Sequence, residues 1–215
     1  MNPTTPLPRY GLSDLPRVPL LPVHESALQQ ARERMLGPGF WRAAKLSAMR
    51  EVLALAQISR LELIGIDPTT ELRVLVRMRC CVPCLPPAAP EPVIERTVEL
   101  SLRYGEEILR GPQPGYSIVE ILKPLHVHHP NVSQGPAQRL CLAASLPRGY
   151  PLREAIVASY AALTLQSVTV DERDPAGVMS PAAARFWQQH MDRIPLSREP
   201  FLAPPVGDAP TGGSA

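Results

Sequence analysis

Aromatic residues, charge of one sign and long apolar runs are all scarce in this chain of 215 residues. Aromatic residues make up 5% of the chain and apolar residues 45%, so the core has to be built mainly from aliphatic side chains. The 22 basic and 20 acidic residues give a formal net charge of +2, which provides no global electrostatic argument for binding nucleic acid or an anionic membrane. No apolar run approaches the length that a membrane span requires.

The first residues show neither the basic start nor the apolar core of a secretory signal, so we expect a cytoplasmic protein. Only four cysteines are present, and Cys80, Cys81 and Cys84 lie together. In a reducing compartment we expect free thiols. Zinc usually takes four ligands in two separated pairs, and no second pair lies near these three, although the distant histidines remain possible ligands. We therefore predict that the protein needs neither a metal nor an organic cofactor.

Proline, in contrast, is abundant at 27 residues, and it clusters at both ends of the chain and between residues 83 and 92. Proline lacks a backbone N–H and disfavours helices and central strands, so these clusters indicate tails and loops. We predict a Pro-rich arm over residues 1–24, one folded domain over residues 25–191, and a Pro- and Gly-rich tail over residues 192–215.

Apolar residues at helical spacing predict a helix from about Glu25 to Gln57, interrupted at residues 37–39, where the sequence is Gly-Pro-Gly. Arg42 and Lys45 fall off the apolar stripe of its second half. Basic residues off the apolar stripe ordinarily lie on the solvent-exposed face of a helix. The functional interpretation is a docking face for an acidic partner.

Alternation of apolar and polar residues then predicts a series of strands. They cover residues 61–66, 71–80, 93–104 and 116–122. A helix follows from about residue 152, and Ser180-Pro181 is a suitable cap for a last helix over residues 182–191. Strands grouped together with helices at the ends predict an α+β domain: an N-terminal helix, a four-stranded antiparallel meander, an irregular segment and two C-terminal helices.

The irregular segment, residues 123–142, carries the candidate chemistry. It reads KPLHVHHPNVSQGPAQRLCL and contains three histidines, the Pro130-Asn131 step and Cys141. A thiol, an imidazole and an amide this close together could support nucleophilic catalysis. The same residues could equally be packing, because free cysteines are most often small buried apolar residues.

Several motifs in order resemble the ubiquitin-conjugating (UBC) fold family, in which an HPN motif shortly precedes a catalytic cysteine. They are HHPNV at 128–132, LCL at 140–142, PLREAIVASYAALTL at 151–165, Asp-Pro at 174–175 and SPAAARFW at 180–187. The resemblance covers roughly Ala31 to His190, and the motifs are specific only as an ordered set. The chain is most similar to divergent bacterial members, which act in ubiquitin-like conjugation systems associated with phage defence. It departs from the family in a longer gap between Asn131 and Cys141.

The resemblance implies a UBC-like fold and a role for each residue. Cys141 would accept a ubiquitin-like modifier from an activating enzyme as a thioester, and an amine, usually a lysine of a target protein, would attack it. Asn131 would donate a hydrogen bond to the developing oxyanion or hold the loop, and His129 and Pro130 would support the turn.

The resemblance also implies an acidic helper and a docking region. Asp174, with Asp171 and Glu172 as alternates, would orient the attacking amine and take its proton. The first helix, with Arg42 and Lys45, would contact a protein partner.

Two other functions stay open. A catalytically inert UBC-like or RWD-like module would only bind partners. A Cys-His hydrolase would pair Cys141 with His128 or His129, although no third residue that could orient the base is evident.

Overall fold

The structure is a computed structural model, and it describes residues 19–87, 89, 91–165, 178–191, 194 and 200–202. Asp171, Glu172 and Asp174 lie outside the described residues, as do most of the predicted arm and tail.

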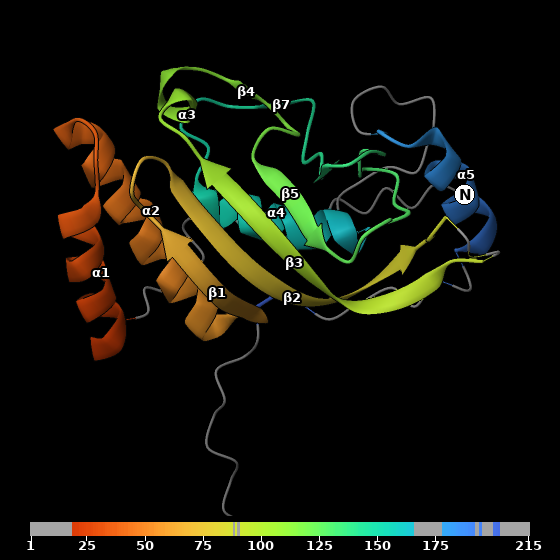
Figure 1. Ribbon diagram of the computed structural model, residues 1–215, viewed down its shortest axis with the longest axis horizontal. Coiled ribbons are helices and arrows are strands. Elements are labelled where there is room, and N and C mark those ends of the chain that lie inside the picture. Colours follow the sequence, from red (N-terminus) through yellow and green to blue (C-terminus); the bar gives the residue numbers. More distant parts are fainter. Residues whose placement is uncertain are drawn as a thin grey trace, which may run out of the picture.

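A five-stranded antiparallel sheet forms the centre of the fold, in the order β1-β2-β3-β5-β6 (Figure 1). Its strands span Leu61–Asp67 (β1), Leu72–Cys84 (β2), Val93–Tyr104 (β3), Val119–Lys123 (β5) and Gln138–Arg139 (β6). The α+β class and the antiparallel meander predicted from the sequence are therefore confirmed. The short strand β6, and a separate two-stranded pair of β4 (Gln113–Pro114) with β7 (Ser145–Leu146), were not predicted.

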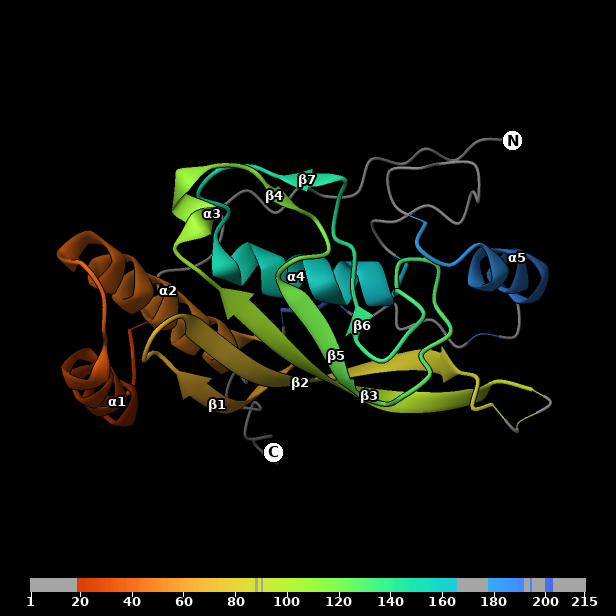
Figure 2. The ribbon, with the colours of Figure 1, turned by 45° about the horizontal axis from the view of Figure 1, so that its top comes forward.

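Helices lie mainly at the two ends of the chain. They span Pro22–Arg34 (α1), Gly39–Ile58 (α2), Glu107–Arg110 (α3), Leu152–Leu163 (α4) and Pro181–His190 (α5). The predicted interruption before Gly39 is confirmed. Helix α4 lies along one face of the sheet, with α2 beside it, and α5 lies at the opposite end of the sheet from α1 and α2 (Figures 1 and 2).

The alternation in β2 and β3 decides which face of the sheet meets the helices. The apolar residues of the alternating pattern are all buried: Leu72, Val74, Val76, Met78 and Cys80 on β2, and Val98, Leu100, Leu102 and Tyr104 on β3. Burying each such aliphatic side chain contributes roughly 1.5–3 kcal/mol, so these strands supply much of the stability of the domain.

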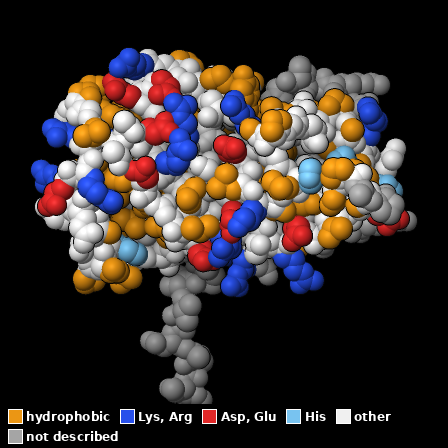
Figure 3. All heavy atoms as spheres, viewed as in Figure 1, with side chains coloured by type: hydrophobic (Ala, Val, Ile, Leu, Met, Phe, Trp, Pro, Cys, Tyr) orange, Lys and Arg blue, Asp and Glu red, His pale blue; other side chains and the backbone are white. Residues whose placement is uncertain are grey.

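The outer face of the sheet is polar. Arg77, for example, forms ion pairs with Glu62 at 2.9 Å and with Glu99 at 2.8 Å. Basic and acidic side chains are interspersed over the view in Figure 3 rather than gathered by sign. Among the described residues, no helix has the length and apolar character needed to cross a membrane.

Strand β2 continues further than the proline pattern predicted. The segment from Val82 onward was expected to leave the sheet, but Val82, Pro83 and Cys84 still pair with β3. The pairing register shifts between Arg79 and Val82. Met78 is the last residue of β2 that pairs with β1, so the N–H that Pro83 lacks removes no hydrogen bond to β1.

Lys45 is placed differently from the prediction. Its side chain is completely buried, and its ammonium group donates to the carbonyl oxygens of Leu36, Pro68, Thr69 and Thr70 at 3.0, 2.7, 2.9 and 3.2 Å. Burial lowers the pKa of Lys45, and nearby Asp67 opposes that shift. A lysine can be buried when its donors are all used. Lys45 therefore ties α2 to the β1–β2 turn and does not face a partner, whereas Arg42 is exposed.

Replacing Lys45 with methionine would leave several buried carbonyl groups without a donor. We expect Lys45→Met to lower the free energy of unfolding by roughly 2–4 kcal/mol, measured by urea denaturation. The control is Arg42→Met on the exposed face of the same helix, for which we expect a change within about 0.5 kcal/mol. Equal urea midpoints for the two variants would contradict this account of Lys45.

Candidate active site

The irregular segment between β5 and α4 is anchored by hydrogen bonds at several points. His128 N donates to the carbonyl of Pro83, near the end of β2, at 2.8 Å. The Gln138 side chain accepts from Val127 N at 2.6 Å and donates to the Pro124 carbonyl at 2.8 Å. Apart from the short strand β6, these hydrogen bonds fix the course of the segment in place of regular secondary structure.

The turn formed by residues 128–131, the HPN turn, is stabilised by His129. Asn131 N donates to His129 Nδ1 at 3.1 Å, which places the proton of the neutral ring on Nε2. The ring is completely buried and meets the Trp187 ring edge-on, with 5.1 Å between centroids. Burial lowers the pKa of His129 to about 3, against a smaller opposing contribution from the Ala162 backbone. His129 is therefore neutral at physiological pH, with one ring nitrogen already occupied.

Cys141 lies against this turn. Its backbone N–H donates to the Asn131 carbonyl at 2.8 Å, directly after a bridge between Val132 and Leu140. The thiol donates to the Ala143 carbonyl at 3.3 Å, and the residue is 6% exposed. Burial raises the pKa of Cys141, and a hydrogen bond with the Ala143 backbone opposes that rise. The thiol is consequently protonated and shielded at neutral pH.

The loop before β5 contacts the backbone that follows Cys141. Leu142 N donates to the Gly115 carbonyl at 3.0 Å. A side chain at Gly115 would bring its Cβ within 1.6 Å of the Ala143 carbonyl oxygen, so only glycine fits there. The sequence offered no signal for this role, because Gly115 is one of several glycines in a Gly- and Pro-containing loop.

Helix α5 covers the HPN turn. The Pro130 carbonyl accepts from Met179 N at 2.7 Å and from Ser180 N at 3.0 Å, and the Trp187 indole donates to the His128 carbonyl at 2.7 Å. Ser180 caps the helix as predicted, since its hydroxyl accepts from Ala183 N at 3.3 Å. The contribution of Trp187 was not predicted, because nothing in the local pattern links it to residues far away in the sequence.

The structure therefore brings Asn131, His129, Pro130 and Cys141 into one site. Asp174 and its alternates are outside the described residues, so the acidic helper stays a prediction. The site lies in the part of the domain next to α5, and α2, which carries Arg42, lies at the other end of the sheet (Figure 1).

The cysteine cluster on β2 does not form a metal-binding arrangement. Cys80 and Cys84 are buried, and burial raises the pKa of each thiol to about 12. In the part of the chain that the structure describes, no three His, Cys, Asp or Glu side chains gather as metal ligands.

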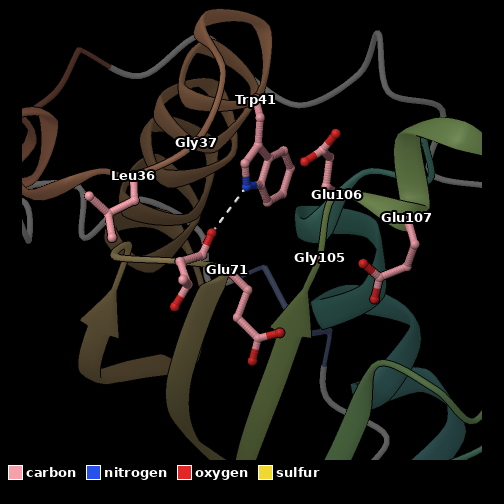
Figure 4. A pocket seen from close by; sticks show the side chains of 8 residues that line it. Leu36, Gly37, Trp41, Glu71, Gly105, Glu106 and Glu107 are labelled. Carbon is pink, nitrogen blue, oxygen red and sulfur yellow. Dashed lines mark hydrogen bonds between the residues drawn. The ribbon is translucent and has the colours of Figure 1, made fainter.

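A concave feature lies at the start of α2, away from Cys141 (Figure 4). This cavity of about 400 Å³ has Trp41 and the carboxylates of Glu71, Glu106 and Glu107 in its lining. Each carboxylate forms an ion pair with an arginine outside the lining. The lining contains no thiol or imidazole, so this cavity does not offer the nucleophilic chemistry of the Cys141 site.

Comparison of the chain with models of protein families, with curated proteins and with solved structures found no match. The function is therefore argued from the chemistry of the site.

A methyl group at position 115 should disturb the backbone beside Cys141. We expect Gly115→Ala to lower the free energy of unfolding by roughly 1–3 kcal/mol, because the atoms in the way are backbone and cannot rotate aside. Gly111→Ala is the matched control, since its backbone is extended and a Cβ there meets nothing within 4 Å. Urea denaturation compares the two, and equal stability would show that the loop relaxes freely.

The burial of His129 predicts a pH dependence of stability. Its pKa is about 3 in the folded protein against an ordinary value of 6.5, so the unfolded chain binds the proton more tightly. The stabilisation is complete above pH 6.5 and is lost as the pH falls toward 3, at up to about 1.4 kcal/mol per pH unit.

This prediction is tested with His129→Asn, measured by urea denaturation between pH 7.5 and 5. The stability difference between wild type and variant should shrink by roughly 2 kcal/mol over that range. Both proteins contain the same carboxylates, so the pH dependence of stability that the carboxylates cause cancels in the difference. A difference that stays constant with pH would rule out a buried neutral His129.

Proposed function

We propose that this protein is a conjugating enzyme for a ubiquitin-like modifier, acting in a setting such as bacterial defence against phage. The observation that carries the proposal is the hydrogen bond from Cys141 N to the Asn131 carbonyl at 2.8 Å. It joins the HPN turn to a thiol within an α+β domain, which is the combination that the sequence motifs imply.

The first step would be transfer of the modifier onto Cys141. The sulfur attacks the C-terminal carbonyl carbon of the modifier, a C–S bond forms, and the bond from that carbon to the activating enzyme breaks. The attacking form is the thiolate, and burial raises the pKa of Cys141. The thiol therefore has to leave the Ala143 carbonyl and lose its proton when the partner docks. Until then its burial protects it from adventitious modification.

The second step would be attack of an amine on the thioester. An amide bond forms, the C–S bond breaks, and the amine loses a proton to a base, for which Asp174 remains the candidate. Negative charge develops on the carbonyl oxygen during the attack. The Asn131 amide, only 2% exposed and on the turn bonded to Cys141, is the nearest candidate for stabilising that charge or for holding the loop.

The proposed docking region keeps one of the two basic residues that the sequence indicated. Lys45 is buried, so Arg42 is the remaining basic candidate on α2. Leu36 and Phe40 nearby are each 57% exposed and add apolar surface to the same end of the domain. A partner protein that docks at this region would contact both the basic side chain of Arg42 and the apolar side chains of Leu36 and Phe40.

A catalytically inert binding module is the second candidate, and the burial of the protonated Cys141 thiol is the observation that favours it. The hydrolase has less support. Among the described contacts, the thiol bonds to the Ala143 carbonyl, and His129 Nδ1 is occupied by Asn131 N, so no imidazole is engaged as a base against the sulfur.

Incubation with a matched activating enzyme, modifier and ATP tests the proposal. We expect an adduct that reductant removes, and Cys141→Ala should abolish it, while Cys141→Ser should give a more stable oxyester. Cys81→Ala is the control, because Cys81 is a more accessible thiol than Cys141 and lies on β2, outside the HPN turn, so its removal should leave the adduct unchanged.

An adduct that persists in Cys141→Ala would overturn the thioester assignment. Absence of any adduct in the wild type would favour the binding module. Cleavage of a modifier–substrate fusion without ATP would favour the hydrolase.

A further inference from the structure

Helix α5 is joined to the HPN turn by hydrogen bonds and by packing. Its buried residues Ala183 and Trp187 belong, with Ile194, to a small apolar cluster separate from the main core. Three hydrogen bonds join the α5 region to the turn: two from Met179 N and Ser180 N to the Pro130 carbonyl, and one from the Trp187 indole to the His128 carbonyl. The helix and the turn therefore hold each other in place.

A continuous set of buried contacts runs from this helix to the nucleophile. The Trp187 indole bonds to His128 and packs edge-on against the His129 ring. His129 Nδ1 accepts from Asn131 N at 3.1 Å, and the Asn131 carbonyl accepts from Cys141 N at 2.8 Å. Protein interiors are close-packed, so a shift of the indole has to be taken up by the turn and by the backbone of Cys141.

We propose that Trp187 is a positioning residue for the Cys141 site, and that α5 sets the geometry of Asn131 and Cys141 through the HPN turn. The catalytic consequence rests on the proposed conjugating function. The structural consequence, that Trp187 keeps the thiol shielded, does not depend on it. Trp187 makes no described contact with the thiol and acts only through the turn.

The chain contains a matched control for Trp187. Its other tryptophan, Trp41, is also buried and also donates its indole N–H to a backbone carbonyl, that of Thr70 at 3.1 Å (Figure 4). Trp187→Phe and Trp41→Phe each remove one such hydrogen bond and keep an aromatic ring. The two variants should therefore lose similar stability, and only Trp187→Phe should affect Cys141.

The first measurement needs no partner protein. The rate of Cys141 alkylation by iodoacetamide is followed by peptide mass spectrometry across pH 7–10. In Trp187→Phe, the freed turn should expose the thiol, so we expect alkylation at a given pH to be about fivefold faster than in wild type and the profile to move to lower pH. A profile that coincides with that of Trp41→Phe would overturn the positioning role.

The second measurement uses the loaded protein. Trp187→Phe should form the thioester to the same extent as wild type but discharge it to free lysine roughly tenfold more slowly, because Asn131 is misplaced. If Trp187→Phe discharges its thioester at the same rate as Trp41→Phe does, the catalytic part of the proposal is wrong. If the wild type forms no thioester, the proposed conjugating function is wrong. The alkylation rates of Cys141 in the two variants still decide whether Trp187 positions the site.

If circular dichroism shows that Trp187→Phe does not fold, Phe186→Leu is measured in its place. Phe186 is half-buried and its ring lies 5.2 Å from that of His128, so this variant loosens the turn and keeps the indole. Faster Cys141 alkylation than in Trp41→Phe would support the proposal, and equal rates would overturn it.

Discussion

The hydrogen bond from Cys141 N to the Asn131 carbonyl is the contact on which the rest of the site depends. It closes the irregular segment on itself, with the Val132–Leu140 bridge beside it. Two other groups of contacts support this closure, one on each side. Gly115 holds the backbone that follows Cys141, and α5 holds the turn that carries Asn131.

Burial sets the electrostatic state of this site. Removing the side chains from water disfavours charge, so it raises the pKa of Cys141 and lowers that of His129. At physiological pH the site is therefore neutral and its thiol is buried. A hydrogen bond that forms in such surroundings is stronger than one exposed to water.

Much of the fold could be predicted because hydrophobic periodicity is a local property. Alternation identified the inward faces of β2 and β3, helical spacing identified α2 and α4, and the Ser180-Pro181 cap identified α5. The same reasoning misplaced Lys45, because periodicity treats lysine as a surface residue and does not detect the carbonyl groups that the β1–β2 turn brings to it. It also ended β2 too early, at Cys80, because prolines disfavour a central strand, whereas Pro83 still pairs with β3.

The sequence by itself determined the order of the longer helices and strands, the apolar faces of the strands and the candidate pair of Asn131 and Cys141, because each depends on neighbouring residues or on an ordered set of motifs. Only the tertiary structure decided that Gly115 meets the backbone after Cys141 and that Trp187 bonds to His128. These contacts join residues far apart in the chain. The hydrogen bond of Trp187 and the steric fit of Gly115 depend on positions in space, for which local sequence carries no periodic signal.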